Sequence, residues 1–575
     1  MRGFPHGWRA RAATVAVAAV VATTVTAAVA PASATAGRAV AAPPRPAPEG
    51  DDGLGARIRR IMTQRQYAHA RWGLLEVDEK GRTVHSVHRG EFFIPGSAAK
   101  LFSVSGTWRT LGGGHRFTTP VRAVGVRDGS VLDGDLVLVA QGDLSLGGRT
   151  GPHGTLEYTD LDHTYANDVP GATLTPQDPL AGIDELARQV RRSGITEVHG
   201  DVVVDSRLFR SSPSLDPAPT PLIVNDNLID LLTTPASAGR PARLSWRPHV
   251  APYRVESSVR TVAAGGATDV SVSASPDGTR IRLSGTIAAD ARPVLRVSPV
   301  RDPDAFGRTA LIEALDREGV SVSAPVTGPN PAGLLPDSTT GGERVAAYVS
   351  PPYTEYAKLI LKVSHNLGAN LGVCLMAVHE GSHDCEDGFR PLGAFIRRAG
   401  VDPGQVELAD GRGGDPVDRV TPVAFSRLLR FWESTPEAAR FRRALPILGV
   451  DGSLAGSCTR RATCPAHGRV FAKPGTVAGF DAVNRRLAVG GQTLAGYLDA
   501  GHGRRHTFFI GVNGAFAPDI EGVLAIGDDL NRIAALLQQQ AATGRGKAAT
   551  RTSARGHAGH PSAKRRVGPQ GRGEA

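Results

Sequence analysis

The chain has 575 residues, of which 41% are hydrophobic, enough for several domains with their own cores. Its formal net charge is +11, but the positive excess lies in residues 1–50 and 541–575, so residues 51–540 are neutral overall. Because the basic character comes only from the two ends, it does not indicate a nucleic-acid-binding domain, and we expect no nucleic-acid partner.

The N-terminus has the pattern of an export signal. Three arginines precede an Ala/Val/Thr-rich run and the triplet Ala32-Ser33-Ala34. This predicts a signal peptide over residues 1–34, cut near Ala34, followed by a Pro/Ala-rich linker over residues 35–50. An uncleaved membrane anchor is the alternative, since the apolar run is nearly long enough to span a bilayer. Either way we expect an exported protein that is extracellular, in the cell wall or on the outer face of the cytoplasmic membrane.

The segment that follows the linker predicts a helix, a hairpin and a second helix. Asp51 or Asp52 is expected to open the first helix. The runs LLEV and TVHSV flank a turn at residues 78–82, which is typical of a β-hairpin. After Ser97, apolar residues recur with helical spacing as far as Leu111.

The rest of the chain predicts a β-rich middle and a mixed C-terminal part. Residues 112–340 contain short strand-like runs and turns, as in ATDVSVSASPDGTRIRLSG. Near the C-terminus lie RVFA, AVNRRLAV, TLAGYLDA and HTFFIGVNG, and then an amphipathic helix over about residues 519–540. We therefore predict an α/β (α+β) domain made of residues 51–111 and 341–540, with residues 112–340 inserted as one or more β-rich domains.

Residues 541–575 are rich in Gly, Ala and Arg and show no apolar periodicity. This composition predicts a disordered basic tail. Outside a cell such a tail would be attracted weakly to anionic wall polymers or lipids. A tail without a specific partner fits the composition equally well.

The four cysteines form two close pairs, Cys374 with Cys385 and Cys458 with Cys464. In an exported protein, two short-loop disulfides are the economical pairing. Metal binding is the alternative, but neither pair has the CxxC spacing that is typical of zinc sites.

Ser97 and Lys100 are the first candidate catalytic residues. The chain has seven lysines among 66 Lys and Arg, so a lysine in this place suggests a task that arginine cannot perform. An ammonium can lose its proton when it is buried or crowded, whereas a guanidinium effectively cannot. At i and i+3 the two side chains share one face of a helix start. A lysine with a lowered pKa can then take the proton of the serine and make it a nucleophile.

Two further segments complete an ordered set of motifs: VSHNLG, with Ser364 and Asn366, and AKPGT, with Lys473, Gly475 and Thr476. The set resembles the S-x-x-K, S-D-N and K-T-G motifs of penicillin-binding proteins and serine β-lactamases. The large interval between the first two motifs, and stretches such as GDLVLVAQGDLSL and LPILGVDGSL, narrow the resemblance. The chain resembles class C low-molecular-mass penicillin-binding proteins, the D-alanyl-D-alanine carboxypeptidase/endopeptidase family, over about residues 55–540.

The resemblance implies a penicillin-binding-protein/β-lactamase-like transpeptidase domain, an antiparallel sheet flanked by helices, with a large β-rich insert. It also implies cleavage between two D-alanines of a peptidoglycan stem peptide. Ser97 would attack the carbonyl, Lys100 would take its proton, and Ser364 would relay a proton to the leaving amine. The substrate would be held by the remaining motif residues: Asn366, Lys473, Gly475 and Thr476. β-Lactams would acylate Ser97, and no metal or organic cofactor would be required.

Three positions depart from the family pattern. Pro474 stands in place of the usual Thr, His365 in place of the common Asp, and the segment DGRGGD has Arg412 where a serine is usual. Strand N–H groups alternate in direction, so the N–H missing at Pro474 points the same way as that of Thr476. If Thr476 N–H faces the cleft, the sheet ladder survives. These departures nevertheless keep open a catalytically impaired cell-wall-binding relative, while the large insert disfavours a β-lactamase.

Residues His379 to His383 spell a literal H-E-x-x-H, which zinc peptidases carry on a continuous helix. Gly381 and the following D-C-E-D-G indicate that the helix ends within the motif, and no third ligand is evident. A zinc peptidase is therefore the weaker alternative. We predict instead a polar helix end closed by a Cys374–Cys385 disulfide.

Overall fold

The computed structural model describes residues 54–544 together with the backbone of Val15 and Ala16. Apart from those two residues, the predicted signal peptide and linker lie outside the described part of the chain, as does the basic tail from residue 545 onward. Within the described residues, no helix has both the length and the apolar character needed to cross a membrane.

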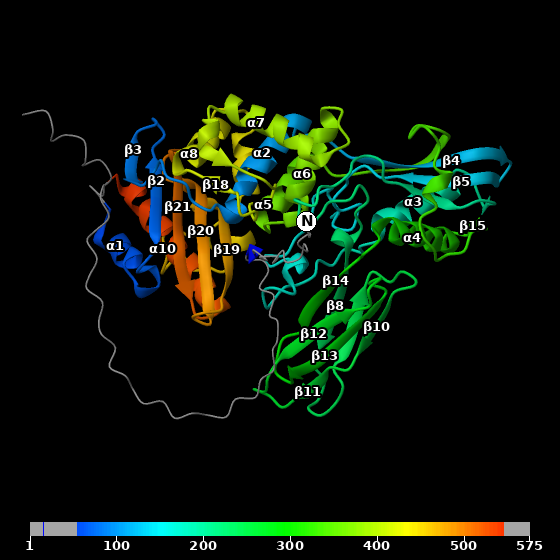
Figure 1. The fold of residues 1–575 in the computed structure, drawn as a ribbon, viewed down its shortest axis with the longest axis horizontal. Helices are drawn as coiled ribbons and strands as arrows, with labels where there is room; N and C mark the ends of the chain where they lie inside the picture. The colour runs from blue at the N-terminus through cyan, green and yellow to red at the C-terminus, as the bar shows by residue number, and fades with distance from the viewer. Residues whose placement is uncertain (1–14, 17–53, 545–575) are drawn as a thin grey trace, which may run out of the picture.

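An antiparallel sheet built from both ends of the chain forms the centre of one lobe (Figure 1). Its strand order is β1-β19-β20-β21-β2-β3. The predicted hairpin of residues 71–87 is confirmed. The four predicted C-terminal runs form three longer strands, because AVNRRLAV covers the turn after Asp481 and then continues into the same strand as TLAGYLDA. The strands are β1 (Val15–Ala16), β2 (Arg71–Val77), β3 (Thr83–Val87), β19 (Val470–Asp481), β20 (Arg486–Asp499) and β21 (Arg505–Ala517).

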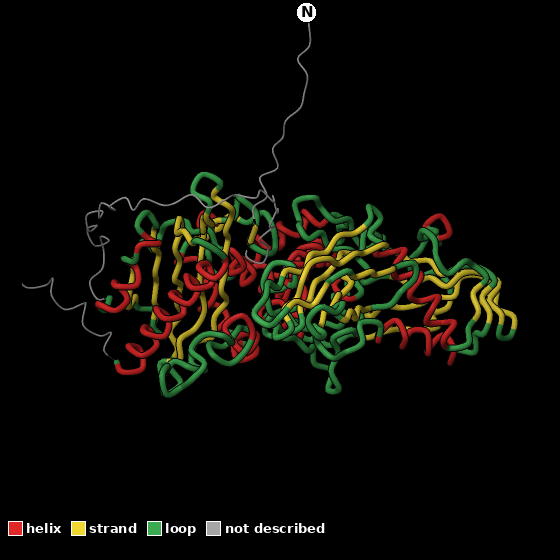
Figure 2. The backbone as a smooth tube through the Cα atoms, turned by 90° about the horizontal axis from the view of Figure 1, so that it is seen from below, coloured by secondary structure: helices red, strands yellow, loops and turns green. Residues whose placement is uncertain are grey.

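Helices cover both faces of this sheet (Figures 1 and 2). Alternate side chains of β21 separate the two cores: Phe508 and Ile510 pack with α1 and α10, whereas Phe509 packs with the larger helical layer. The first layer consists of α1 (Ala56–Met62) and α10 (Ile520–Thr543). The second consists of α2 (Lys100–Leu111), α5 (Tyr353–Lys362), α6 (Asn366–His379), α7 (Phe389–Arg398), α8 (Pro422–Glu433) and α9 (Ala438–Ala444).

Two predicted helix boundaries are wrong. The first helix begins after Gly55, which occupies the N-cap position, and not at Asp51 or Asp52. The last helix begins where predicted, because the Asp519 side chain accepts a hydrogen bond from Gly522 N–H, but it continues to Thr543. There Gly544 adopts φ 69°, a left-handed conformation that suits glycine at a helix end. Residues 541–543 are thus helical and not part of a disordered tail.

The chain between α2 and α5 forms a second, β-rich lobe, as the fold class predicted (Figure 1). Its largest sheet contains β4 (Thr118–Asp128), β5 (Val131–Val139), β6 (Glu197–Val198), β7 (Val202–Asp205), β15 (Ser321–Val322) and β16 (Glu343–Val349). Two smaller sheets contain β8 (Leu228–Thr234), β9 (Arg243–Arg247) and β14 (Val294–Pro299), and β10 (Arg254–Ser257), β11 (Arg260–Val262), β12 (Asp269–Ala274) and β13 (Arg280–Ala288).

Two helices of this insert, α3 (Ala181–Arg192) and α4 (Pro303–Arg317), were not expected from the sequence. Their signals were available. In α3, Ile183, Leu186 and Val190 are buried at helical spacing, and Asp302 caps α4 just ahead of a proline at its first position.

Both predicted disulfides are present. Cys374 of α6 is bonded to Cys385 of η6 (Cys385–Gly388), and Cys458 is bonded to Cys464 in the loop before β19. Neither pair is therefore available as thiolates for a metal ion.

Replacing both Cys374 and Cys385 by alanine should lower the free energy of unfolding by about 3 kcal/mol, because the bond closes a loop with a sequence separation of 11 and constrains the unfolded chain. The matched double variant at Cys458 and Cys464, with a separation of 6, should lose slightly less, about 2 kcal/mol. Denaturant titration without reductant measures both. A Cys374/Cys385 variant as stable as the wild type would contradict this expectation.

Candidate active site

Ser97 lies in η2 (Gly96–Ala99), a short 3-10 turn that leads directly into α2. Lys100 begins α2, and its side chain is completely buried. Its Nζ lies 2.7 Å from Ser97 Oγ, so the i, i+3 spacing brings the two groups into contact, as predicted. The hydroxyl and the amine are therefore within proton-transfer distance before any substrate arrives.

The other contacts of Lys100 match those of an uncharged amine. Its Nζ also lies 2.7 Å from Asn366 Oδ1 and 3.0 Å from the carbonyl oxygen of Arg412. A neutral amine has two N–H groups, which these two acceptors take, and its lone pair then faces the hydroxyl of Ser97. Asn366 thus holds Lys100 in position, and the Arg412 carbonyl does the same.

The surroundings of Lys100 favour its neutral form. Burial lowers the pKa of Lys100 well below its ordinary value, and the positive charge of Lys473 lowers it further. Burial also lowers the pKa of Lys473 itself, to about 7. Burial and a neighbouring positive charge are the two effects that lower the pKa of Lys100 enough for it to act as a base.

Lys473 joins the second motif to the third. Its Nζ donates to Ser364 Oγ at 2.9 Å and to the carbonyl oxygen of Pro474 at 2.7 Å. The residue lies on β19 and is completely buried in the cleft. The Ser364–Lys473 pair thus acts on the Ser97–Lys100 pair through the charge of Lys473.

Pro474 leaves the pairing between β19 and β20 intact. The two strands remain in register across it, with Pro474 opposite Leu494. Two residues earlier, Ala472 N–H donates to Pro446 O, away from β20. Because N–H directions alternate along a strand, positions 474 and 476 also point away from β20. The proline therefore removes no ladder bond, and Thr476 N–H is directed outward, as expected.

Two glycines allow β19 to lie against the nucleophile turn. A Cβ at Gly475 would lie 2.1 Å from Pro95 O, and a Cβ at Gly96 would lie 2.5 Å from Thr476 N. Gly96 also has φ 50°, a conformation that favours glycine. This close approach places Thr476 N–H beside Ser97, so that the two backbone N–H groups can address the same oxygen atom.

The segment DGRGGD supports the site through its backbone. The Asp410 carboxylate accepts hydrogen bonds from the N–H groups of Arg412, Gly413 and Gly414, which fixes the loop. The carbonyl of Arg412 is thereby aimed at Lys100. The sequence flagged Arg412 as a departure, yet the group that contacts the lysine is a carbonyl, which any side chain would leave in place. Only the repeated glycines signalled a tight loop.

His365, the departure in the second motif, is completely buried and caps α6. Its Nδ1 accepts the N–H of Gly368 at 3.0 Å, the bond that an N-cap side chain normally provides. Its Nε2 lies 3.0 Å from Oδ1 of Asp226, a residue of the insert that the sequence analysis did not single out. Since Nδ1 accepts, Nε2 carries the proton and donates to the carboxylate.

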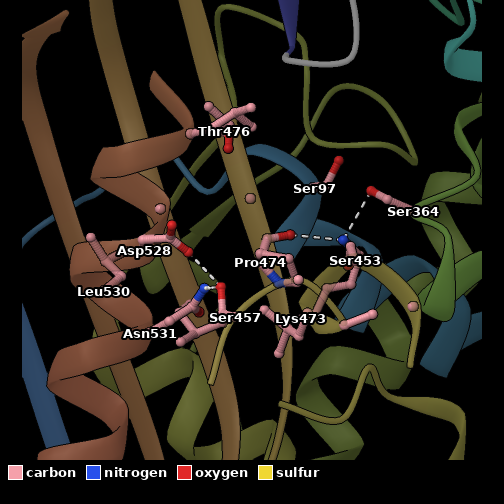
Figure 3. Close-up of a pocket in the computed structure, with 18 of the residues that line it drawn as sticks. Ser97, Ser364, Ser453, Ser457, Lys473, Pro474, Thr476, Asp528, Leu530 and Asn531 are labelled. Carbon is pink, nitrogen blue, oxygen red and sulfur yellow. Dashed lines mark hydrogen bonds between the residues drawn. The ribbon is translucent and has the colours of Figure 1, made fainter. Parts of the chain in front are cut away.

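A cavity of about 470 Å³ is lined by five of the candidate residues, Ser97, Ser364, Lys473, Gly475 and Thr476 (Figure 3). Ser97 and Ser364 lie on one side of β19, and Lys473 and Pro474 lie between them and the loop around Ser457. Asp160 and Tyr165 of the insert also line this cavity, so the insert forms part of its wall. Neither residue belongs to a recognisable motif, and sequence reasoning missed both.

Behind the second motif lies a buried cluster of charged side chains, with three carboxylates, two guanidiniums and two imidazoles. Its members are Arg149, Asp162, His163, Asp226, Asp230, Arg247 and His365. Both ring nitrogens of His163 face carboxylates, at 2.7 Å from Asp226 and 2.5 Å from Asp230. Although burial opposes it, the charges of Asp230 and Asp162 raise the pKa of His163 to about 10.

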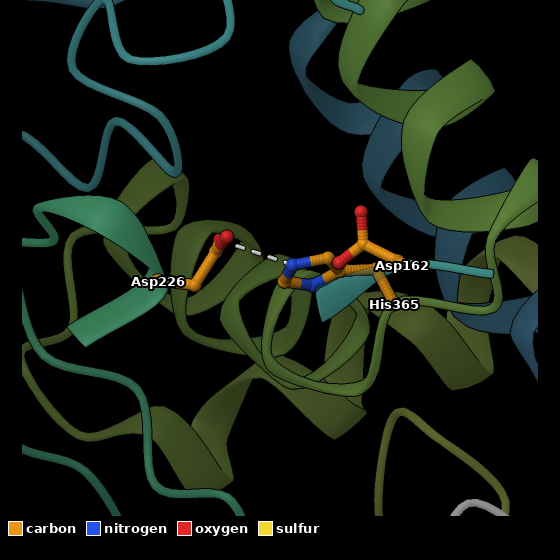
Figure 4. Close-up of side chains that lie close together, drawn as sticks. All are labelled: Asp162, Asp226 and His365. Atoms are coloured by element: carbon orange, nitrogen blue, oxygen red, sulfur yellow. Dashed lines mark hydrogen bonds and ion pairs between the residues drawn. The ribbon is translucent and has the colours of Figure 1, made fainter. Parts of the chain in front are cut away.

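Within the described residues, Asp162, Asp226 and His365 are the one group whose ligand atoms converge closely enough to hold a metal ion (Figure 4). Their lone pairs are already engaged. Arg149 donates to Asp162 at 2.7 Å and to Asp226 at 2.7 Å, and His365 Nδ1 accepts from the backbone. With His163 protonated, three positive charges balance three carboxylates. The donor set does not need a cation and would have to expel Arg149 to accept one.

The H-E-x-x-H segment does not form a zinc site. The helix α6 ends at His379, and Gly381 adopts φ 84°, so the chain turns before it reaches His383. The Nδ1 of His383 lies 2.9 Å from the carbonyl oxygen of Leu208 in the insert. The two histidines therefore lack the continuous helix that the zinc motif requires.

A serine hydroxyl bonded to a buried lysine amine, in a cleft between an antiparallel sheet and a helical layer, defines a serine hydrolase that uses lysine as its base. Residues 54–534 match the sequence model of the family described as D-Ala-D-Ala carboxypeptidase 3 (S13). The chain belongs to this family.

Individual relatives agree with this assignment. The chain is 26% identical over 436 residues to a D-alanyl-D-alanine carboxypeptidase of Actinomadura sp. (strain R39), over 72% of this chain and 74% of the relative. The crystal structure of penicillin-binding protein 4 from Haemophilus influenzae has the same fold, with a TM-score of 0.61 and 18% identity. The match covers 84% of this chain and 100% of that one. Its complex with a β-lactam matches with a TM-score of 0.59 and 19% identity, covering 83% and 99%.

Because the charged cluster is balanced without a cation, treatment with EDTA should leave the melting temperature unchanged, and added Zn²⁺ should not raise it. Differential scanning calorimetry checks both, and metal analysis of the untreated protein gives an independent readout. A melting temperature that falls with EDTA and recovers with one metal would show that the cluster, or another site, binds an ion.

Proposed function

We propose that this protein is a serine-type D-alanyl-D-alanine carboxypeptidase/endopeptidase that acts on peptidoglycan stem peptides through an acyl-enzyme on Ser97. The observation that carries the proposal is the contact between Ser97 Oγ and the completely buried amine of Lys100, whose pKa is lowered by burial and by Lys473. Membership of the S13 family supplies the substrate class.

In the acylation step, Ser97 Oγ attacks the carbonyl carbon between the two D-alanines while Lys100 Nζ takes its proton. The C–N bond of the tetrahedral intermediate then breaks. The leaving amine receives a proton through Ser364 Oγ, which lies 2.9 Å from Lys473 Nζ. Water hydrolyses the acyl-enzyme and regenerates Ser97, so no group outside the chain is consumed other than water.

The negative charge on the carbonyl oxygen would be stabilised by the backbone N–H groups of Ser97 and Thr476. The short distance that Gly96 permits between the nucleophile turn and Thr476 N supports this assignment. The loss of one such donor typically costs about 10²–10³ in rate. Pro474 leaves Thr476 N–H in place, which favours an active enzyme over the catalytically impaired wall-binding alternative.

Substrate binding is assigned to the remaining motif residues. The ammonium of Lys473 supplies the positive charge that a terminal carboxylate requires, and Asn366 holds both Lys100 and the substrate amide. Gly475 keeps β19 close to η2. The proline at 474 offers the substrate neither a hydroxyl nor an N–H, so docking here depends on Lys473 and Thr476 more than in a site with threonine at this position.

Peptidoglycan lies outside the cytoplasm, so a family that acts on it works on the cell-wall side of the membrane. We propose that residues 1–34 direct export and that the basic segment from residue 545 contacts anionic wall polymers or lipids. The net charge of this segment supports the second suggestion.

Incubation of the mature protein with benzylpenicillin should give a stable penicilloyl adduct, seen by intact-mass spectrometry, because a β-lactam presents a strained amide to Ser97. The Ser97→Ala variant should give none, and Ser273→Ala, at an exposed serine on β12 of the insert, should react like the wild type. A folded wild-type protein that forms no adduct would contradict the proposed activity and favour the catalytically impaired wall-binding alternative.

The rate of acylation at low penicillin concentration should depend on pH in a way set by two lysines. Protonation of Lys100 removes the base, so the rate falls on the acidic side, below its lowered pKa. On the alkaline side the rate should decline as Lys473 loses its charge near its pKa of about 7.

Lys473→Met tests this assignment. Without the neighbouring charge, the protonated form of Lys100 is less destabilised, its pKa rises, and the acidic limb of the pH profile moves to higher pH. Lys473→Arg keeps the charge and should leave the limb in place. Stopped-flow acylation over a pH series measures both. An acidic limb at the same pH in Lys473→Met and the wild type would remove Lys100 from the role of base.

A further inference from the structure

Ser364 has an unusual backbone conformation. Its φ is 65°, in the left-handed region that side chains with a Cβ rarely adopt. It follows the end of α5, where His365 N–H donates to Ile360 O at 3.0 Å, a helix-end position at which glycine is preferred. Such a conformation persists only where the surroundings hold it in place. The serine hydroxyl, which meets Lys473 Nζ, explains why glycine does not stand here.

The insert contacts this strained residue and the residue that follows it. The hydroxyl of Tyr165, from η3 (His163–Tyr165), donates to the carbonyl oxygen of Ser364. One residue later, Asp226 of η4 (Asn225–Asn227) accepts a hydrogen bond from His365 Nε2 at 3.0 Å. Burial raises the pKa of Tyr165, so its hydroxyl remains a donor at neutral pH.

Asp226 is itself held rigidly. Its side chain is 3% exposed, and its second oxygen accepts from Arg149 and from His163, each at 2.7 Å. Both cations belong to the insert, and they place the carboxylate before it meets His365. The contact is therefore a fixed support from one lobe to the other.

We propose that the insert positions the second motif: Asp226, acting through His365, and Tyr165 hold Ser364 in the left-handed conformation that aims its hydroxyl at Lys473. Both are positioning residues: Tyr165 lines the cavity but acts here through its bond to the Ser364 carbonyl, and Asp226 does not line the cavity. The inference rests on the proposed function, in which Ser364 relays the proton to the leaving amine. The proposal also explains why histidine stands at position 365 where the family commonly has aspartate. An aspartate there would face the carboxylate of Asp226 and be repelled by it, whereas the histidine donates a hydrogen bond to it.

Asp226→Asn and Asp230→Asn form a matched pair. Both remove one carboxylate from the same buried cluster, but Asp230 contacts His163 and Arg247 and does not touch His365. Stopped-flow acylation by benzylpenicillin separates the acylation rate constant from the dissociation constant of the preceding complex. Asp226→Asn should lower the rate constant roughly 10- to 100-fold with little change in the dissociation constant, as expected for a misplaced relay group. Asp230→Asn should acylate like the wild type.

Tyr165→Phe removes the second support without disturbing the cluster, and it should also lower the rate constant. Equal losses in Asp226→Asn and Asp230→Asn, or unchanged rates in both Asp226→Asn and Tyr165→Phe, would overturn the proposal.

Hydrogen exchange gives a readout that needs no activity. The amides of residues 365–368 should exchange faster in Asp226→Asn than in Asp230→Asn, because Gly368 N–H depends on the ring of His365. Equal protection in the two variants would overturn the positioning role even if both are acylated. Absence of an adduct on the wild type would instead count against the proposed function, and the exchange comparison would still decide the positioning role.

Discussion

The structure depends on keeping one amine uncharged inside the protein. A buried ammonium is costly, so Lys100 remains neutral where it has two acceptors for its N–H groups and a hydroxyl for its lone pair. Asn366, the Arg412 carbonyl and Ser97 meet that requirement at 2.7, 3.0 and 2.7 Å. The charge of Lys473 adds repulsion that would appear only if Lys100 became protonated. Much of the local architecture follows from these three contacts and from the charge of Lys473.

These partners come from distant parts of the chain. Asn366 and Arg412 stand 266 and 312 positions from Lys100, and Lys473 lies on β19, a strand of the sheet that both chain ends build. Close packing without side chains, at Gly96 and Gly475, brings that strand to the nucleophile. The insert also contributes a distant contact. It lies between the first and second motifs in the sequence, and its residues Tyr165 and Asp226 contact the second motif. A large insertion is thus compatible with a precise site, because the insert itself contacts the second motif and supports it.

The sequence predicted the parts of the site that have short-range signals. Ser97 and Lys100 share a helix start, the two cysteine pairs are local, and the three motifs appear in order, so the sheet, the helical layer and the candidate residues followed. Contacts made by backbone groups or across the two lobes had no such signal. The Arg412 carbonyl, Asp226 and Tyr165 contact the motifs through folding of distant segments. The helices α3 and α4 did have local signals, in their apolar spacing and in the Asp302 cap, and these were overlooked in a segment rich in strands.

The three departures from the family pattern share a physical explanation. At Arg412 the contact with Lys100 is made by a carbonyl, and at Pro474 the carbonyl accepts from Lys473 while the missing N–H faces away from β20. At His365 the ring takes over helix capping through Nδ1 and gains a partner in Asp226 through Nε2. In each case the substituted side chain leaves the Ser97–Lys100 and Ser364–Lys473 hydrogen bonds in place. Side-chain identity at a motif position is therefore a weak guide to lost activity where the backbone supplies the functional group.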